Sequence, residues 1–144
     1  TLNAVAALAG HKLIIEPVSV PKSRKLMEVL KQGPVHLASP NFDQIEQMAG
    51  TRDIETAFAF LHKKGLRNVV IHAGPEGAFV SGGTDIDYVE ARPPARIIDV
   101  TGAGDAAVAG LVYGLLKGEP LAVAAARGQK LAGQVIARDA STLE

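Results

Sequence analysis

The sequence has 144 residues, in which 15 lysines and arginines balance 15 aspartates and glutamates, and it contains no cysteine. The balanced charge argues against binding to nucleic acid or to an anionic membrane, because both need a strong positive field. The lack of cysteine excludes disulfides and thiolate metal sites. Hydrophobic residues make up 47% of the chain, as in a globular α/β domain, and no apolar run reaches the roughly 18 residues of a membrane span.

Short apolar runs alternate with amphipathic segments in the first half of the chain. Three runs rich in apolar and β-branched residues, each bounded by turn residues, predict buried parallel strands over 13–15, 35–38 and 69–72. Apolar side chains at helical spacing predict helices over 22–31, 42–48 and 54–64, with Gly50 and Gly65 as stop signals. An Ala-rich segment, 2–8, is expected to be the end of an earlier helix.

The second half of the chain begins with a predicted hairpin. Residues 74–77 have the composition of a tight turn, and 78–80 and 88–91 are the next expected strands. A helix is expected from Gly104 through the apolar run that ends at Leu116, and a last one over 121–137. The order of these elements predicts a mostly parallel sheet covered by helices on both faces, with a hairpin near its end.

The most informative stretch is Asp99-Val-Thr-Gly-Ala-Gly-Asp105, which leads directly into that apolar helix. Residues 102–104 have almost no side chain. Their backbone N–H groups can therefore surround a compact anion such as phosphate at the start of a helix, where the dipole also favours negative charge. Asp105 would lie in the first turn beside the anion, where it can accept a proton from an attacking hydroxyl. The alternative is a Gly-rich turn before a helix that Asp105 merely caps.

This stretch resembles the C-terminal signature of the ribokinase-type (PfkB) carbohydrate and nucleoside kinases. The resemblance implies a ribokinase-like three-layer α/β fold, with residues 1–144 as the C-terminal, nucleotide-binding and catalytic-base half of a longer domain. Since the sequence also lacks a starting Met, we expect a C-terminal fragment that is inactive alone. The resemblance further implies that Asp105 is the catalytic base. It also implies that the transferred phosphoryl group binds the amides of Gly102, Ala103 and Gly104, and that a monovalent cation binds near Asp99 and Thr101.

The turn at 74–77 has two readings. Its glycines let the backbone approach a ligand closely, but a purely structural turn between strands explains the spacing equally well. In the kinases that the sequence resembles, the comparable turn lines the ATP site, which implies ATP contacts from His72, Gly74 and Gly77. Gln129, on the last predicted helix, lies about where these relatives place an Asn near the adenine.

Asn41 follows a predicted strand, with Asp43, Gln44 and Glu46 close behind it. An amide with nearby acids can organise phosphates and Mg²⁺, which keeps several waters and needs only one or two carboxylates. The structural alternative is that Asn41 caps the next helix. The kinases resembled here usually carry Glu three residues after this Asn, where this chain has Gln44. A neutral amide there would weaken an indirect hold on the metal unless Asp43 or Glu46 compensates.

The segment Glu16-Pro17-Val18-Ser19, followed by Lys22, is similar to the Asp-Pro-Val-Ser segment of pseudouridine kinases in the same superfamily and departs from it at Glu16. A strand-ending turn with a solvated Lys22 is the structural alternative. The similarity favours pseudouridine as acceptor, with ribokinase, fructokinase and adenosine kinase activities as alternatives. A non-catalytic nucleotide- or sugar-binding protein of this fold and a plain structural domain are alternatives of other classes.

The reaction that the resemblance implies transfers the γ-phosphoryl group of ATP to a hydroxyl of a sugar or nucleoside. Its expected cofactors are ATP and Mg²⁺, with K⁺ as a further candidate. We expect a small-molecule acceptor, no nucleic-acid or membrane partner, a homodimer as the assembly to test, and a cytoplasmic location. The four histidines, at 11, 36, 62 and 72, have neither an i, i+4 pair nor a Cys partner, so a His metal site is not expected.

Overall fold

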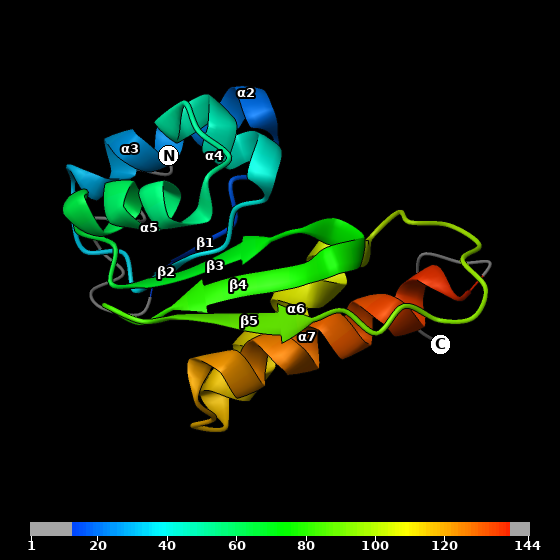
Figure 1. Ribbon diagram of the computed structural model, residues 1–144. Helices are drawn as coiled ribbons and strands as arrows, with labels where there is room; N and C mark the ends of the chain where they lie inside the picture. The colour runs from blue at the N-terminus through cyan, green and yellow to red at the C-terminus, as the bar shows by residue number, and fades with distance from the viewer. Residues whose placement is uncertain (1–12, 139–144) are drawn as a thin grey trace. The chain divides into compact units, whose positions relative to one another are not determined.

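The computed structural model describes residues 13–138 (Figure 1). The chain divides into two compact units, the first made of Thr1–His72 with Ser81–Ile86 and the second of Ala73–Val80 with Asp87–Glu144. Five strands form one sheet in the order β1-β2-β3-β4-β5, which confirms the predicted α/β class. The helix predicted at 2–8 lies outside the described residues. Among residues 13–138, no helix combines the length and apolarity needed to cross a membrane.

The first unit contains three strands that pair in parallel, as predicted: β1 (Ile14–Ile15), β2 (Leu37–Ala38) and β3 (Asn68–His72). The register places Ile14 opposite Leu37, and Ala38 opposite Val69. Its helices are α2 (Val20–Ser23), α3 (Lys25–Leu30), α4 (Phe42–Ala49) and α5 (Ile54–Lys63). Gly50 and Gly65 follow α4 and α5 with φ angles of 71° and 95°, so both helices stop where glycine permits a left-handed residue.

The single helix predicted over 22–31 was wrong in two respects. The helical segment begins earlier, at Val20, and it is interrupted at Arg24, which separates α2 from α3. Tighter i to i−3 bonds replace the α-helical ladder there, since Met27 N donates to Arg24 O at 3.0 Å. The buried hydroxyl of Ser23 also donates to Val20 O at 2.7 Å, a local bond that competes with continuous helix.

The core of the first unit is formed by apolar side chains from its helices and strands. Those that are no more than 2% exposed include Leu26, Val29, Leu37, Ile45, Phe58, Leu61, Leu66, Val69 and Ile71. The spacing of the buried residues on α5, Ala57, Phe58 and Leu61, is the one that the sequence pattern indicated. Helices α3, α4 and α5 are therefore held to their own unit by burial of apolar side chains.

The second unit contains a 3₁₀ turn over Gly74–Glu76 and the strands β4 (Gly77–Ser81) and β5 (Ile86–Glu90), with Ser81 and Ile86 belonging to the first unit. Its helices α6 (Ala103–Leu116) and α7 (Leu121–Ile136) pack against each other through glycines. A Cβ on Gly110 would lie 2.8 Å from Gly128 Cα, and a Cβ on Gly128 would lie 2.3 Å from Ala107 O. The two backbones therefore approach too closely for any side chain at these positions.

Candidate functional site

The start of α6 is a bare backbone turn. Gly102 is the N-cap residue with a φ of 80°, and no side chain caps the helix. Nothing lies within 4 Å of a Cβ built on Gly104. The N–H of Ala103 donates to Val100 O at 3.2 Å, whereas no hydrogen bond within residues 13–138 uses the N–H of Gly102 or Gly104. Two of the three predicted amides are therefore free to bind an anion, and the third is shared with the turn.

Asp105 lies in the first turn of α6 and is exposed. None of the side chains or backbone groups that the structure describes forms a hydrogen bond or ion pair with its carboxylate. It does not cap the helix, because the N-cap of α6 has no side-chain bond. Because this carboxylate is exposed and has no partner among these groups, it can form a hydrogen bond to the hydroxyl of an acceptor and take its proton.

Asp99 and Thr101 form a small turn ahead of α6. Asp99 Oδ1 accepts from the backbone N of Thr101 at 2.9 Å and from its hydroxyl at 2.8 Å. These bonds hold the pKa of Asp99 below its usual value, the backbone bond contributing most. Both side chains lie exposed, so their oxygens are together on the surface, where a monovalent cation was predicted.

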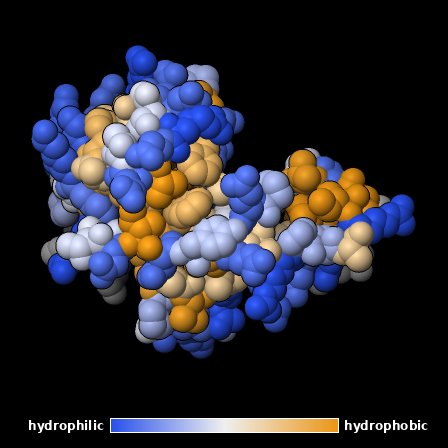
Figure 2. Space-filling view, viewed as in Figure 1, coloured by the Kyte–Doolittle hydropathy of each residue, from blue (hydrophilic) through white to orange (hydrophobic). Residues whose placement is uncertain are grey.

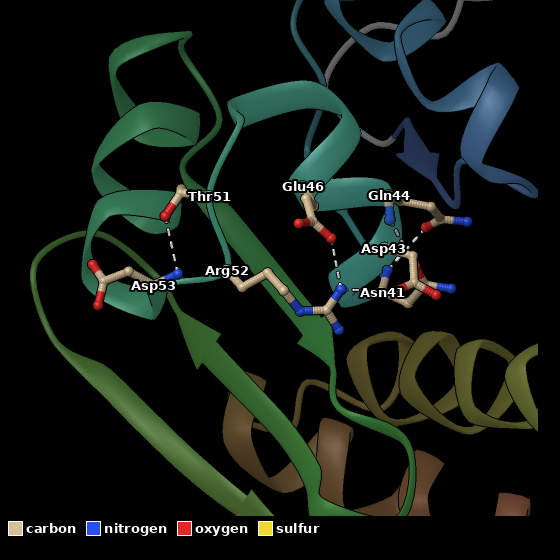
Figure 3. A network of polar contacts seen from close by, with 7 residues as sticks. All are labelled: Asn41, Asp43, Gln44, Glu46, Thr51, Arg52 and Asp53. Atoms are coloured by element: carbon tan, nitrogen blue, oxygen red, sulfur yellow. Dashed lines mark hydrogen bonds and ion pairs between the residues drawn. The ribbon is translucent and has the colours of Figure 1, made fainter.

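Asn41 and Gln44 form a capping box at the start of α4 (Figure 3). Asn41 Oδ1 accepts from Gln44 N, and Gln44 Oε1 accepts from Asn41 N, both at 2.9 Å. The structural alternative for Asn41, a helix cap, is thus the role that its side-chain oxygen has. Its Nδ2 forms no hydrogen bond within the described part of the chain and stays available for the predicted ATP contact.

The acids beside this capping box are paired with Arg52. Its Nη1 donates to Asp43 Oδ1 and to Glu46 Oε2, each at 2.8 Å (Figure 3). Its guanidinium lies 5.5 Å from the ring centroid of Phe42. In residues 13–138, no three His, Asp or Glu side chains gather into a metal site. Each acid therefore has one carboxylate oxygen bound to Arg52 and shares that single positive charge with the other acid. Arg52 was missed in the sequence, since its role depends on the loop that returns it to α4.

His72 ends β3 and is half-buried. Its Nε2 lies 2.7 Å from the hydroxyl oxygen of Ser39, which directly follows β2 and is completely buried. Its backbone N donates to Pro40 O at 2.8 Å, and Asn41 and His72 form an isolated parallel bridge. Burial lowers the pKa of His72 to about 4. The imidazole is therefore neutral and joins the ends of β2 and β3, a contact that sequence reasoning missed.

The glycines predicted to approach ATP differ in their surroundings. Gly74 has a φ of 58° and open space where a Cβ would lie. Gly77 has a φ of 118°, and a Cβ there would lie 2.1 Å from Val89 O and 2.7 Å from Ala91 N. The close approach of β5 is thus enough to require glycine at 77, which is the structural reading of this turn. Gly74 keeps the accessible backbone that a ligand needs.

The second unit has a groove of about 980 Å³ along α7. It is lined by residues of β5, of the segment after it and of α7, among them Tyr88, Arg92, Val123, Arg127, Gln129 and Gly133. Gln129 is only 9% exposed, and its amide has no hydrogen-bond partner within residues 13–138. Since no fully buried side-chain nitrogen or oxygen there lacks a partner, the amide reaches the groove surface. The position predicted near the adenine therefore lines a cavity.

Two further surface features concern the predicted acceptor loop and the segment before α6. Val18 has a φ of 61°, which is a strained conformation for a β-branched residue, and its side chain is 70% exposed. Its N–H donates to Glu16 Oε2 at 2.9 Å.

Figure 2 shows apolar residues gathered over the segment between β5 and α6, where Ile97 and Val100 are 54% and 67% exposed.

The sequence matches the model of the pfkB family carbohydrate kinases over residues 1–143. It is 31% identical to the pseudouridine kinase of Escherichia coli over 119 residues, which is 79% of this chain and 37% of that protein. It is 32% identical to the cytidine kinase of Thermococcus kodakarensis over 141 residues, which is 94% of this chain and 50% of that one.

The fold is similar to that of Arabidopsis thaliana ribokinase complexed with ribose and ATP, with a TM-score of 0.79 and 22% identity. That match covers 96% of this chain and 46% of the ribokinase. The chain thus spans half or less of the length of these relatives. A family model that matches almost every residue, together with a ribokinase-like fold, shows that the chain belongs to the PfkB family of carbohydrate kinases.

Proposed function

We propose that the protein transfers the γ-phosphoryl group of ATP to a hydroxyl of a sugar or nucleoside, with Asp105 as the proton acceptor. The observation that supports this most directly is the exposed carboxylate of Asp105, which has no partner within residues 13–138 and lies in the same turn as the unused N–H groups of Gly102 and Gly104. The N–H groups would donate to oxygens of the transferred group, which gain negative charge. Asp105 would orient the hydroxyl and accept its proton late in the transfer.

Some of the residues proposed to bind ATP would contact it directly, and others would only shape the backbone around it. Gly74 offers open backbone, Asn41 offers a free Nδ2, and Gln129 offers an unpartnered amide in the groove along α7. His72 and Gly77 would act through backbone shape, since the His72 ring bonds to Ser39 and Gly77 is required by the close approach of β5. Bound ATP supplies the phosphoryl group and a strongly charged leaving group.

The metal fits this chain mainly as a partner of the nucleotide. Mg²⁺ needs only one or two carboxylates beyond phosphates and water, and Asp43 and Glu46 each have one oxygen bound to Arg52. A monovalent cation would bind at the oxygens of Asp99 and Thr101, which one turn holds together on the surface. A site of two side-chain oxygens needs further oxygens from backbone or water to be complete.

Pseudouridine is the acceptor that we favour. The strained Val18, held by Glu16, belongs to the loop whose sequence is similar to that of pseudouridine kinases, and strain of this kind is common at ligand sites. The pseudouridine kinase of Escherichia coli is among the relatives. A cytidine kinase and 1-phosphofructokinases are relatives too, so acceptors of those chemistries belong in any test.

The test measures ADP release by the purified full-length protein with pseudouridine, cytidine, adenosine, ribose and fructose 1-phosphate as acceptors. We expect turnover with one acceptor, and loss of turnover in Asp105→Asn by at least about a hundredfold, with ATP affinity retained. Asp87→Asn, which neutralises another exposed aspartate of the same unit, is the matched control and should keep full turnover. Full activity in Asp105→Asn would remove that residue from the reaction, and ATP binding without turnover on any acceptor would favour a non-catalytic binding protein.

A further inference from the structure

Gln129 is the buried polar side chain of the groove along α7. It is only 9% exposed, whereas the other polar and charged side chains that line the groove are all exposed. No hydrogen bond within residues 13–138 uses its amide. A buried amide without a partner costs free energy until a ligand or water bonds to it. This group therefore favours a ligand that offers hydrogen bonds at the groove surface.

The backbone that carries Gln129 is held in place on two sides. Gly128 packs against α6, where a Cβ would lie 2.3 Å from Ala107 O. Gly133, one turn further along α7, packs against the segment after β5, where a Cβ would lie 2.9 Å from Arg92 O. All of these residues, and all that line the groove, belong to the second unit. The side chain of Gln129 therefore starts from a preorganised position.

The amide at the end of this side chain is free to turn. The last torsion of a glutamine is broad and roughly twofold, and a half-turn exchanges the carboxamide oxygen and the NH₂ group. Gln44 lacks this freedom, because its oxygen accepts from Asn41 N at 2.9 Å. At Gln129 no bond within residues 13–138 favours one orientation. The groove can therefore present an acceptor beside a donor in either order.

The two common purine bases differ in the order of these groups. Adenine carries the N6 donor beside the N1 acceptor, whereas guanine carries the O6 acceptor beside the N1–H donor. An amide matches adenine in one orientation and guanine in the other, with two hydrogen bonds each time. Discrimination requires a group that cannot turn, because only then does the wrong base leave polar atoms unpaired. An amide that turns freely therefore stabilises both bases.

We propose that Gln129 pairs with the base of the phosphoryl donor in either orientation, so that the protein uses GTP as well as ATP. This inference rests on the proposed function, because it assumes that a nucleoside triphosphate binds along α7 and is the phosphoryl donor. The reacting atoms are the same for both nucleotides. The bond from the γ-phosphorus to its bridging oxygen breaks, the bond to the acceptor oxygen forms, the hydroxyl proton passes to Asp105, and GDP leaves in place of ADP.

The substitution Gln129→Glu removes the freedom to exchange donor and acceptor. A carboxylate only accepts, so it can bond to the N1–H and the N2 amino group of guanine, but it meets the lone pair of adenine N1. Gln134→Glu places the same charge on an exposed side chain of the same groove and is the matched control. Gln129→Met keeps an unbranched side chain and removes both hydrogen bonds. Thermal unfolding checks that the variants remain folded.

The measurement is the affinity of the purified full-length protein for MgATP and for MgGTP by calorimetry. We expect the two dissociation constants of the unsubstituted protein to lie within about tenfold of each other. Gln129→Glu should shift their ratio toward GTP at least about tenfold, because one bond to adenine is lost and one to guanine is gained. Gln134→Glu should leave the ratio unchanged, and Gln129→Met should weaken the binding of both nucleotides to a similar extent.

Three results would overturn the inference and leave the phosphotransfer proposal intact. They are a larger preference of the unsubstituted protein for ATP, an unchanged ratio in Gln129→Glu, and weaker binding of only one nucleotide in Gln129→Met. Failure of the unsubstituted protein to bind ATP would overturn both the inference and the proposed function.

Discussion

Acid should destabilise the protein through His72, and the size of the effect follows from its burial. In the unfolded chain this imidazole has its ordinary pKa of 6.5, whereas burial lowers the pKa to about 4 in the folded state. Between these pH values the unfolded state binds the proton and the folded state does not, so stability falls as the pH falls. Each pH unit corresponds to about 1.4 kcal/mol, which gives a loss of about 3 kcal/mol from pH 6.5 to pH 4.

The perturbation that isolates this effect is His72→Gln, because the amide of Gln reaches as far as Nε2 and can bond to the Ser39 hydroxyl without titrating. Urea unfolding followed by circular dichroism gives the free energy of unfolding at intervals between pH 7.5 and pH 4. The protein also loses stability in acid through carboxylates such as Asp53, whose pKa is lowered by its bonds to Thr56. The relevant quantity is therefore the difference between the unsubstituted protein and the variant.

We expect His72→Gln to lose about 3 kcal/mol less than the unsubstituted protein across this range, since its carboxylates are unchanged. His36→Gln is the matched control, because His36 belongs to the same unit but is exposed, and it should show no such difference. Parallel stability curves for His72→Gln and the unsubstituted protein would refute the conclusion that His72 is held neutral by burial.

Three further substitutions test the packing and the caps. Gly128→Ala places a methyl group 2.3 Å from Ala107 O and should lower the free energy of unfolding by about 3 kcal/mol or more by forcing α6 and α7 apart, which urea unfolding measures. Asp53→Ala removes the bond that Thr56 N donates to the N-cap of α5 and should lower the free energy of unfolding at pH 7, and by progressively less as the pH falls through the lowered pKa of Asp53. Gly104→Ala meets nothing within 4 Å and should raise it slightly, by up to about 1 kcal/mol, yet slow phosphoryl transfer in the ADP-release assay, because the methyl group would crowd the anion. Unchanged turnover in Gly104→Ala would count against the anion site at α6, and an unchanged unfolding midpoint in Gly128→Ala against the close helix contact.

The prediction of elements succeeded where local chemistry determines them. Gly50 and Gly65 stop their helices because glycine adopts the left-handed conformation without strain. The glycines at 110 and 128 lie where α6 and α7 touch. The interruption of the helix at Arg24 was not predicted, since periodicity alone cannot show that Ser23 bonds back to Val20.

The structure shows which hydrogen bonds the candidate site residues form, and the sequence alone could not predict these bonds. The spacing of Asn41 and Gln44 indicates a capping box as readily as a metal site, and only the coordinates show that both amide oxygens are used in the cap. The contact between His72 and Ser39 joins residues 33 positions apart. It exists because the parallel strands β2 and β3 end at the same edge of the sheet.

The sequence by itself determined the family, the glycine-rich turn at 102–104 and the carboxylate that follows it, because these depend on residue types at fixed local spacing. The tertiary structure decided which polar groups remain free. Asp105 is exposed and unpaired within residues 13–138, whereas Arg52 pairs with Asp43 and Glu46. Whether a polar group is free to bind a ligand depends on residues that the fold brings next to it from elsewhere in the chain. A local sequence pattern does not show which residues these are. A polar side chain can act on a ligand only through the atoms that its own fold leaves unbonded.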